Sequence, residues 1–281
     1  MALSIHAHDR DVAGMTYVYP VVSRRAGGLS IGINLNPNNA CNWRCIYCQV
    51  PDLSRGGPPP VDLARLEAEL RRMLEDVTRG DYLSRQVPEG MRRLNDVAFS
   101  GNGEPTSAAE FPEAVKRVGR VLQDFGLVGR IKLVLITNGS LAGKSPVQAG
   151  IRDMADLNGE VWFKFDRATR AGMQRVNDTE TDPERHFQRL RLVAALCPTW
   201  VQTCFFSLDG APPDDTEVNA YLAMLGRARR GIPALAGVLL YDIARPSLQP
   251  EAARLGKLPA GWLEVLAARI RNLGLETRVS L

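Results

Sequence analysis

The feature that most constrains the fold is a repeated alternation of short apolar segments with longer amphipathic ones. Strict alternation of strands and helices predicts parallel strands joined by right-handed crossovers, an α/β class. Two closures compete, an open doubly wound sheet or a barrel; a complete barrel needs about eight such units, and about six are visible here. The strands are expected at 29–35, 96–100, 131–136, 161–165, 200–208 and 235–240, with a short one at 276–280. Helices are expected at 62–77, 111–125, 146–157, from 183, at 218–225 and at 262–273.

Three of the five cysteines lie within one short segment after the first strand, Cys41-Asn-Trp-Arg-Cys45-Ile-Tyr-Cys48. Thiolates at i, i+4 and i+7 can fold around one iron–sulfur cube, which normally has four cysteine ligands. Three ligands leave one iron open to a group that is not protein, and an open position is typical of a metal centre that does chemistry. The triplet therefore predicts a reactive [4Fe–4S] cluster.

Zinc is the alternative, because structural zinc sites also use closely spaced cysteines. Such a site closes a tetrahedron, so a fourth ligand would have to be Cys197, Cys204, His6, His8 or His186. None of these belongs to a second C-x2-C pair, the usual partner in zinc modules. A zinc-stabilised binding module is therefore less favoured than an iron–sulfur protein. Disulfides are not expected, since two bonds would leave an odd thiol in a chain without a secretory signal.

The C-x3-C-x2-C spacing resembles the signature of the radical S-adenosylmethionine (SAM) enzymes, including the aromatic residue before the last cysteine, here Tyr47. The turn Gly101-Asn102-Gly103-Glu104-Pro105 is similar to the family's Gly-Gly-Glu-Pro element, with Asn102 replacing the second glycine. Small residues let the backbone approach a ligand, and a carboxylate accepts hydrogen bonds from an ammonium group. The resemblance implies a partial (β/α)6 barrel of parallel strands, radical SAM type, over 29–281, after an N-terminal extension over 1–28.

The resemblance also implies roles for individual residues. Cys41, Cys45 and Cys48 would be the catalytic, metal-binding residues, with SAM on the open iron. Tyr47 would lie near the adenine and Glu104 at the amino group of SAM. The other residues expected to bind this cofactor are Gly101, Asn102, Gly103, Asn138, Lys164, Asp166 and Gln202.

Polar residues at the later strand ends are expected to meet at one edge, because sites in parallel α/β folds form at the carboxyl ends of strands. Lys164 and Asp166 point to the same side of their strand and either form an ion pair or hold the carboxylate and ribose of SAM. Only one of Gln202 and Thr203 can face the interior. Further residues near the mouth are Asn138, in a Thr-Asn-Gly turn, and Tyr241, Asp242 and Arg245.

The implied activity is that of a radical SAM iron–sulfur oxidoreductase. A reduced cluster cleaves SAM, and the resulting 5′-deoxyadenosyl radical abstracts hydrogen from an unidentified substrate. The implied partners are SAM, an electron donor such as flavodoxin or ferredoxin, and a substrate that is a small molecule, RNA or protein. A glycyl-radical activase or maturation protein, acting on a protein partner, is a further alternative. The segment 161–177 also resembles the radical SAM portion of the wybutosine tRNA-modifying enzymes, but their second cysteine set is not found here.

Composition adds little to the choice of substrate. The net charge of +4 is compatible with RNA but does not argue for it. No apolar run approaches the ~20 residues of a membrane span, so we expect a cytoplasmic protein. In the N-terminal extension, we expect His6 and His8 to lie on a surface arm, and Tyr17, Tyr19 and Pro20 to pack against the barrel.

Overall fold

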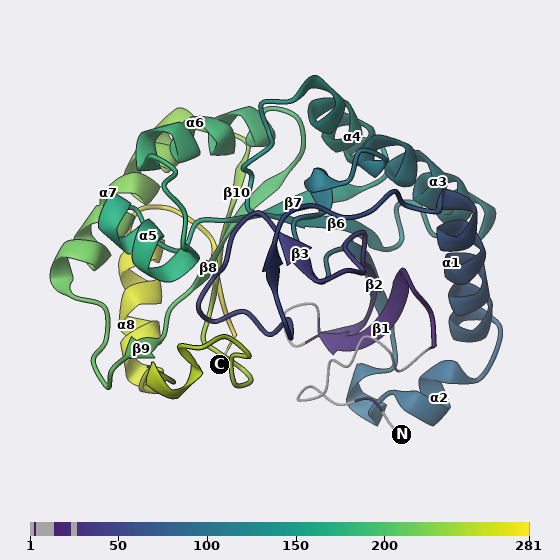
Figure 1. The fold of residues 1–281 in the computed structure, drawn as a ribbon, viewed down its shortest axis with the longest axis horizontal. Coiled ribbons are helices and arrows are strands. Elements are labelled where there is room, and N and C mark those ends of the chain that lie inside the picture. The colour runs from purple at the N-terminus through teal and green to yellow at the C-terminus, as the bar shows by residue number, and fades with distance from the viewer. Residues whose placement is uncertain (1–2, 4–13, 24–26, 281) are drawn as a thin grey trace.

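The computed structural model describes residues 3, 14–23 and 27–280. Within these ranges one curved sheet of eight strands runs in the order β1-β2-β5-β6-β7-β8-β10-β12. Every neighbouring pair is parallel except β1 and β2, which are antiparallel. Since β1 and β12 do not pair with each other, the sheet is an open arc with helices around its outside (Figure 1). The predicted fold class, an α/β partial barrel, is confirmed.

The elements have the following bounds. The strands of the main sheet are β1 Val18–Ser23, β2 Gly28–Ile33, β5 Leu94–Phe99, β6 Lys132–Thr137, β7 Gly159–Lys164, β8 Thr199–Cys204, β10 Leu235–Tyr241 and β12 Thr277–Ser280. The short strands are β3 Ala40–Cys41, β4 Ser54–Arg55, β9 Ser207–Leu208 and β11 Leu255–Gly256. The helices are α1 Leu63–Thr78, α2 Tyr82–Gln86, α3 Phe111–Asp124, α4 Ser145–Ala155, α5 Arg170–Asn177, α6 Pro183–Ala194, α7 Asp215–Gly231 and α8 Ala260–Arg271.

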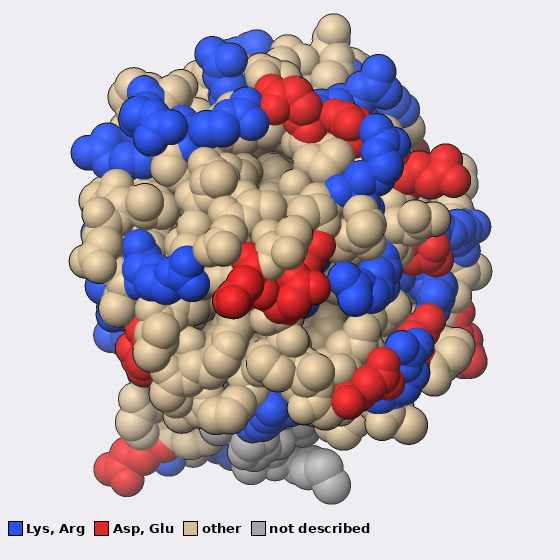
Figure 2. Space-filling model, turned by 90° about the vertical axis from the view of Figure 1, so that its left-hand side faces the viewer, with Lys and Arg blue, Asp and Glu red and all other residues tan. Residues whose placement is uncertain are grey.

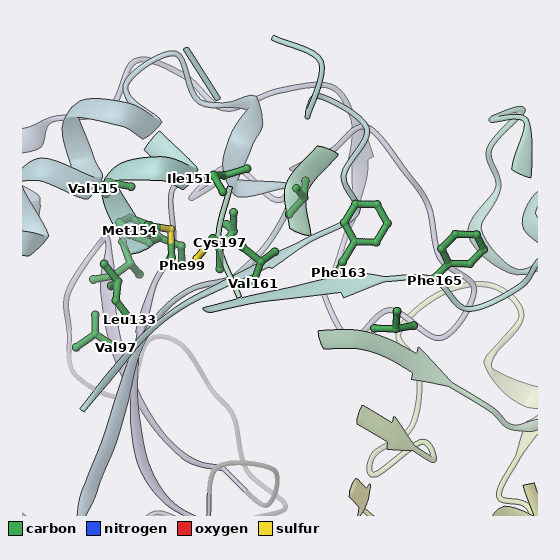
Figure 3. Packing of buried hydrophobic residues seen from close by; sticks show 14 of the residues in the cluster. Val97, Phe99, Val115, Leu133, Ile151, Met154, Val161, Phe163, Phe165 and Cys197 are labelled. Carbon is green, nitrogen blue, oxygen red and sulfur yellow. The ribbon is translucent and has the colours of Figure 1, made fainter. Parts of the chain in front are cut away.

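The main hydrophobic core lies between the sheet and the surrounding helices. Strand residues whose side chains point outward pack against apolar helix residues (Figure 3). Burying each large apolar side chain stabilises the fold by about 1.5–3 kcal/mol, so this layer holds the sheet in its curve. The opposite, inward face carries a separate small cluster: Ala98, Val134, Trp162, Trp200 and Leu239.

Several elements differ from the predictions, among them helix α2, which was not predicted. The strand predicted to reach residue 208 ends at Cys204, because Phe205 and Phe206 leave the sheet and stack against the guanidinium of Arg167. Strand β1 was not predicted, since proline is rare inside strands; here Pro20 lies in an edge strand, where it is tolerated. Helix α5 was also missed, and its eight residues are too few for a clear helical period.

The later part of the predicted N-terminal extension joins the sheet. Tyr17 and Tyr19 are buried, and the ring of Tyr19 covers Gly32, so the expected packing against the barrel is confirmed. His6 and His8 lie outside the described residues. No helix within the described ranges has both the length and the apolar character needed to cross a membrane.

Candidate active site

The cysteine loop, residues 40–55, follows β2 and crosses the middle of the arc (Figure 1). Side-chain amides attach it to the turns after β5 and β6. Asn138 Nδ2 donates to Asn42 Oδ1 at 2.9 Å, and Asn42 Nδ2 donates to Ser140 Oγ at 2.7 Å. Asn102 Nδ2 donates at 2.5 Å to Oδ1 of Asn39, the residue that precedes the loop. The loop is therefore held at the carboxyl ends of the parallel strands, where the sequence predicted a site.

The two glycines of the turn after β5 let this turn pack directly on neighbouring backbone. A Cβ atom at Gly103 would lie 2.1 Å from the carbonyl oxygen of Ala40, inside the cysteine loop. Gly101 has φ +134°, and its Cβ would lie 2.4 Å from Asn34 Oδ1. Close approach at these positions was predicted for a ligand, and the structure shows it for the chain itself. Their contact with SAM stays a prediction.

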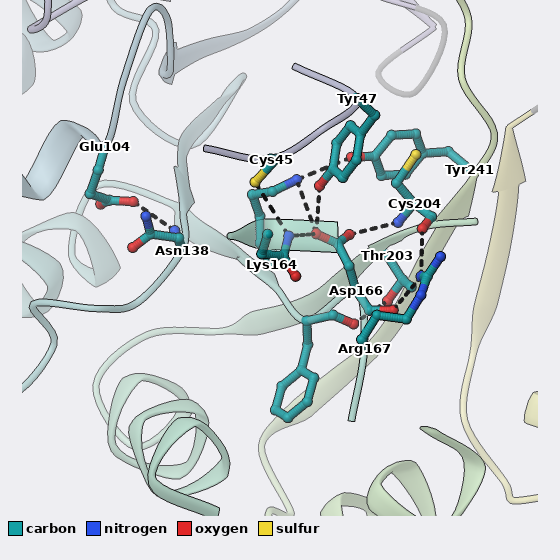
Figure 4. Close-up of polar contacts among 12 residues, drawn as sticks. Cys45, Tyr47, Glu104, Asn138, Lys164, Asp166, Arg167, Thr203, Cys204 and Tyr241 are labelled. Carbon is teal, nitrogen blue, oxygen red and sulfur yellow. Dashed lines mark hydrogen bonds and ion pairs between the residues drawn. The ribbon is translucent and has the colours of Figure 1, made fainter. Parts of the chain in front are cut away.

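Glu104 is a buried carboxylate with several donors around it. Its Oε1 accepts hydrogen bonds from the Thr106 amide at 3.1 Å and from the hydroxyls of Thr106 and Thr137, both at 2.6 Å. Its Oε2 accepts from the Asn138 amide at 2.6 Å (Figure 4). Burial raises the pKa of Glu104, and these donors oppose the rise. Each carboxylate oxygen has two lone-pair sites, so Oε2 retains room for a further donor such as an ammonium group.

Lys164 and Asp166 lie on the same side of the chain, as predicted, and their charged atoms are 3.9 Å apart. Asp166 Oδ2 also accepts from the Tyr47 hydroxyl at 2.5 Å and from Asn177 Nδ2 at 2.7 Å, while Oδ1 accepts from the Cys204 amide at 2.9 Å (Figure 4). The expected ion pair is therefore present, and protein donors surround Asp166. A bond from Asp166 to a ribose stays a prediction.

The ammonium of Lys164 lies between two tyrosines. Its Nζ donates to the Tyr241 hydroxyl at 3.2 Å and is 4.9 Å from the centre of the Tyr47 ring. Burial lowers the pKa of Lys164, but the carboxylate of Asp166 and other nearby groups raise it by more. The net effect is a pKa above the ordinary value for lysine. The side chain therefore carries a fixed positive charge next to the cysteine loop.

Burial also acts on the thiols of the cysteine loop. It raises the pKa of Cys41 to about 11 and that of Cys45 to about 12. Metal ligation requires the thiolate form, so binding of a cluster would release protons from these groups.

Gln202 and Thr203 point to opposite sides of β8. Thr203 bonds to the Phe165 carbonyl and the Tyr221 hydroxyl on the helix-facing side. Gln202 pairs in register with Lys164, so its side chain faces the interior of the arc. It is 1% exposed, and neither its Oε1 nor its Nε2 has a hydrogen-bond partner among the described residues. A buried amide without partners is unfavourable by itself, and the contact of Gln202 with SAM stays a prediction.

A segment that sequence reasoning missed holds the cysteine loop from the other side. Ser247 Oγ donates to the Ile46 carbonyl at 2.7 Å, and Gln249 Nε2 donates to the carbonyls of Val50 at 2.9 Å and Cys48 at 3.3 Å. Both side chains are buried. No local pattern could have indicated these contacts, because about 200 residues separate the partners.

The arrangement of possible ligands bears on the choice between iron–sulfur and zinc. Within the described residues, no three His, Cys, Asp or Glu side chains are gathered as ligands of one metal ion. Cys197 lies in the main core (Figure 3), and His186 is enclosed by aromatic rings. A zinc site needs four donors around one ion, whereas a cube attaches each thiolate to a different iron. Cys204, by contrast, packs in one small cluster with Cys45, so the preference for a [4Fe–4S] cluster over zinc stays a prediction.

Of the other residues expected near the mouth, Tyr241 contacts Lys164, and Asp242 has a structural role. Asp242 is buried and accepts hydrogen bonds from the amides of Ile243 at 2.6 Å and Leu258 at 3.0 Å. Arg245 is joined to the cysteine loop, since its carbonyl accepts from Gln49 Nε2 at 3.1 Å.

The surface over α5 to α8 carries charges of both signs (Figure 2). Pairs such as Arg227–Glu184 at 2.8 Å and Arg170–Asp182 at 2.7 Å join them.

Comparison with known proteins gives distant relatives. No protein-family model matches the chain. It is 26% identical over 141 residues to the GTPase Obg of Brachyspira hyodysenteriae and 28% identical over 173 residues to the UPF0026 protein MJ1312 of Methanocaldococcus jannaschii. These alignments cover 49% and 58% of this chain but 17% and 44% of those proteins. The chain thus spans less than half the length of both curated relatives.

Solved structures share the architecture over most of the chain. TYW1 with a lysine-pyruvate adduct bound has a TM-score of 0.56 at 16% identity, covering 88% of this chain and 74% of that one. A radical SAM methyltransferase from Sphaerobacter thermophilus has a TM-score of 0.57 at 14% identity, and the match covers 90% of this chain and 66% of that one. Streptococcus suis SuiB bound to S-adenosylmethionine has a TM-score of 0.54 at 10% identity, and the match covers 91% of this chain and 48% of that one. The resemblance to the radical SAM superfamily is confirmed at the level of the fold.

Proposed function

We propose that this chain, which has the fold of the radical SAM enzymes, holds a [4Fe–4S] cluster on Cys41, Cys45 and Cys48 and cleaves SAM reductively. When bound, the cluster supplies the electron that converts SAM to methionine and a 5′-deoxyadenosyl radical, which removes hydrogen from a substrate. The observation that carries the proposal is the position of the triplet, on a loop held over the carboxyl ends of parallel strands beside a buried carboxylate and an ammonium group.

The charged side chains around the loop suit the two ends of an amino acid. Glu104 Oε2 has room for an ammonium group, and Lys164 offers a positive charge for a carboxylate. These groups belong to different strand ends, and the amides of Asn42 and Asn138 link the loop to one of them. Together they would bind and orient the methionyl part of SAM.

We assign Asp166 and Tyr47 to the positioning of the Lys164 ammonium group. The short bond from the Tyr47 hydroxyl to Asp166 fixes the ring, and the ring in turn lies against the Lys164 ammonium. Gln202, which pairs in register with Lys164, has an amide that faces the interior without a hydrogen-bond partner among the described residues. We assign Gln202 to the recognition of SAM or of the substrate.

The test is anaerobic reconstitution with iron and sulfide, followed by a SAM-cleavage assay with a strong reductant. We expect a brown wild-type protein that produces 5′-deoxyadenosine and methionine. Cys45→Ala should lose the colour and the activity, because a required ligand is missing. Cys197→Ala, a matched cysteine substitution in the main core, should retain both.

Two results would overturn the proposal. One is a wild-type protein that stays colourless after reconstitution and contains one zinc ion per chain. The other is a Cys45→Ala variant that cleaves SAM as fast as the wild type.

A further inference from the structure

Asn177 is the last residue of α5, and its side chain reaches the cysteine loop. The residue is 1% exposed. Its Nδ2 donates to Cys45 Sγ at 3.3 Å and to Asp166 Oδ2 at 2.7 Å. An amide nitrogen has two hydrogens, so the two acceptors use the full donor capacity of this group.

The backbone around Asn177 is joined to the same loop. The Ile46 amide donates to the Val176 carbonyl at 2.9 Å, and the Arg44 amide donates to the Asn177 carbonyl at 3.3 Å. Asp178 then ends the helix with a left-handed conformation, φ 47°, and pairs with Arg44 Nε at 2.9 Å. The end of α5 is therefore fixed against the residues on both sides of Cys45, and the direction of the Asn177 amide is determined by Asp166.

We propose that Asn177 is a positioning residue that raises the reduction potential of the cluster through its hydrogen bond to the Cys45 sulfur. The inference rests on the proposed function, in which Cys45 is a thiolate ligand. Hydrogen bonds to the sulfurs are one of the means by which a protein tunes an iron–sulfur potential. One-electron reduction adds negative charge to the cluster and its ligands, so a donor at the sulfur stabilises the reduced form more than the oxidised form.

Substitution of Asn177 by leucine tests this, since leucine has a similar size and no donor. Asn219→Leu is the matched control, on the exposed side of α7. Both variants and the wild type are reconstituted, and the midpoint potential is measured by redox titration followed by electron paramagnetic resonance of the reduced cluster. Loss of one charge-assisted hydrogen bond should disfavour reduction about tenfold, equal to a potential lower by about 59 mV for one electron. Asn219→Leu should match the wild type.

Asn177→Ala serves if the leucine variant does not fold or does not retain iron. Alanine has no donor and adds no charge beside Asp166, so the midpoint potential of this variant should fall in the same direction. Clusters that assemble fully in the variants with an unchanged potential would overturn this inference alone. A wild-type protein without a cluster would overturn the proposed function and, with it, this inference.

Discussion

His186 should make the stability of the protein depend on pH. It is fully buried, with ring centroids 4.8 Å from Phe163, 4.5 Å from Phe165 and 5.4 Å from Trp43 of the cysteine loop. Its Nε2 lies 2.9 Å from the Lys164 carbonyl oxygen, whereas Nδ1 has no partner among the described residues. Burial lowers the pKa of His186 to about 4. The folded protein therefore holds this imidazole neutral.

The sign and size of the effect follow from linkage. The unfolded chain takes up a proton on this residue as the pH falls below about 6.5, while the folded protein resists protonation until the pH approaches about 4. The stability due to neutral His186 is therefore present above the unfolded pKa and is lost as the pH falls through this window. Between about pH 7 and pH 5, His186 alone should lower the free energy of unfolding by about 2 kcal/mol.

Urea unfolding at these two pH values measures the effect, with the reduced apoprotein as the sample. His186→Phe suits the aromatic surroundings, and His186→Gln can still donate to the Lys164 carbonyl. Neither variant titrates, so each should lose about 2 kcal/mol less than the wild type between the two pH values. Comparing each protein with itself at the two pH values cancels constant losses of packing. Comparing the resulting differences among the three proteins cancels the titration of carboxylates common to them. Equal losses in all three proteins would refute the reasoning.

Two further predictions concern the turn after β5 and the interior of the arc. Gly103→Ala should lower the amount of iron bound after reconstitution, because the added Cβ displaces the Ala40 backbone and with it the cysteine loop. Gly57→Ala is the control and should bind as much iron as the wild type, since its added Cβ has no atom within 4 Å. If both retain full iron, the glycine does not position the loop. Gln202→Leu should raise the free energy of unfolding by about 1–3 kcal/mol, since it removes a buried amide that has no partner within the described part of the chain. The same variant should cleave SAM more slowly. A less stable variant with full activity would contradict both expectations.

Much of the fold could be predicted because the signals are local. Apolar runs of β-branched residues marked the strands of the parallel sheet, and Asp182-Pro183 marked the start of α6, where the Asp182 carboxylate accepts from the Glu184 amide at 3.0 Å. Elements with weak local signals were missed. The edge strand β1 contains a proline, and α5 is only eight residues long.

The candidate site, like the fold, has features that local sequence predicts and features that it does not. The cysteine spacing and the glycines of the turn could be identified from neighbouring residues alone. The bond between Asn177 and Cys45 joins positions 132 residues apart, and no sequence pattern relates them. The inward direction of Gln202 depends on the register of β8 against β7, because a shift of one residue would have turned Thr203 inward instead.

The amino-acid sequence by itself determined the class of fold and the spacing of the three cysteines from which a cluster is predicted, since periodicity and ligand spacing are properties of short segments. Only the tertiary structure decided which side chains surround that loop. Lys164 and Asp166 form an ion pair, and each is also hydrogen-bonded to a tyrosine. Ser247 and Gln249 donate hydrogen bonds to backbone carbonyls of the loop. These contacts depend on the curvature and register of the sheet, which bring distant strand ends together and which no single segment specifies.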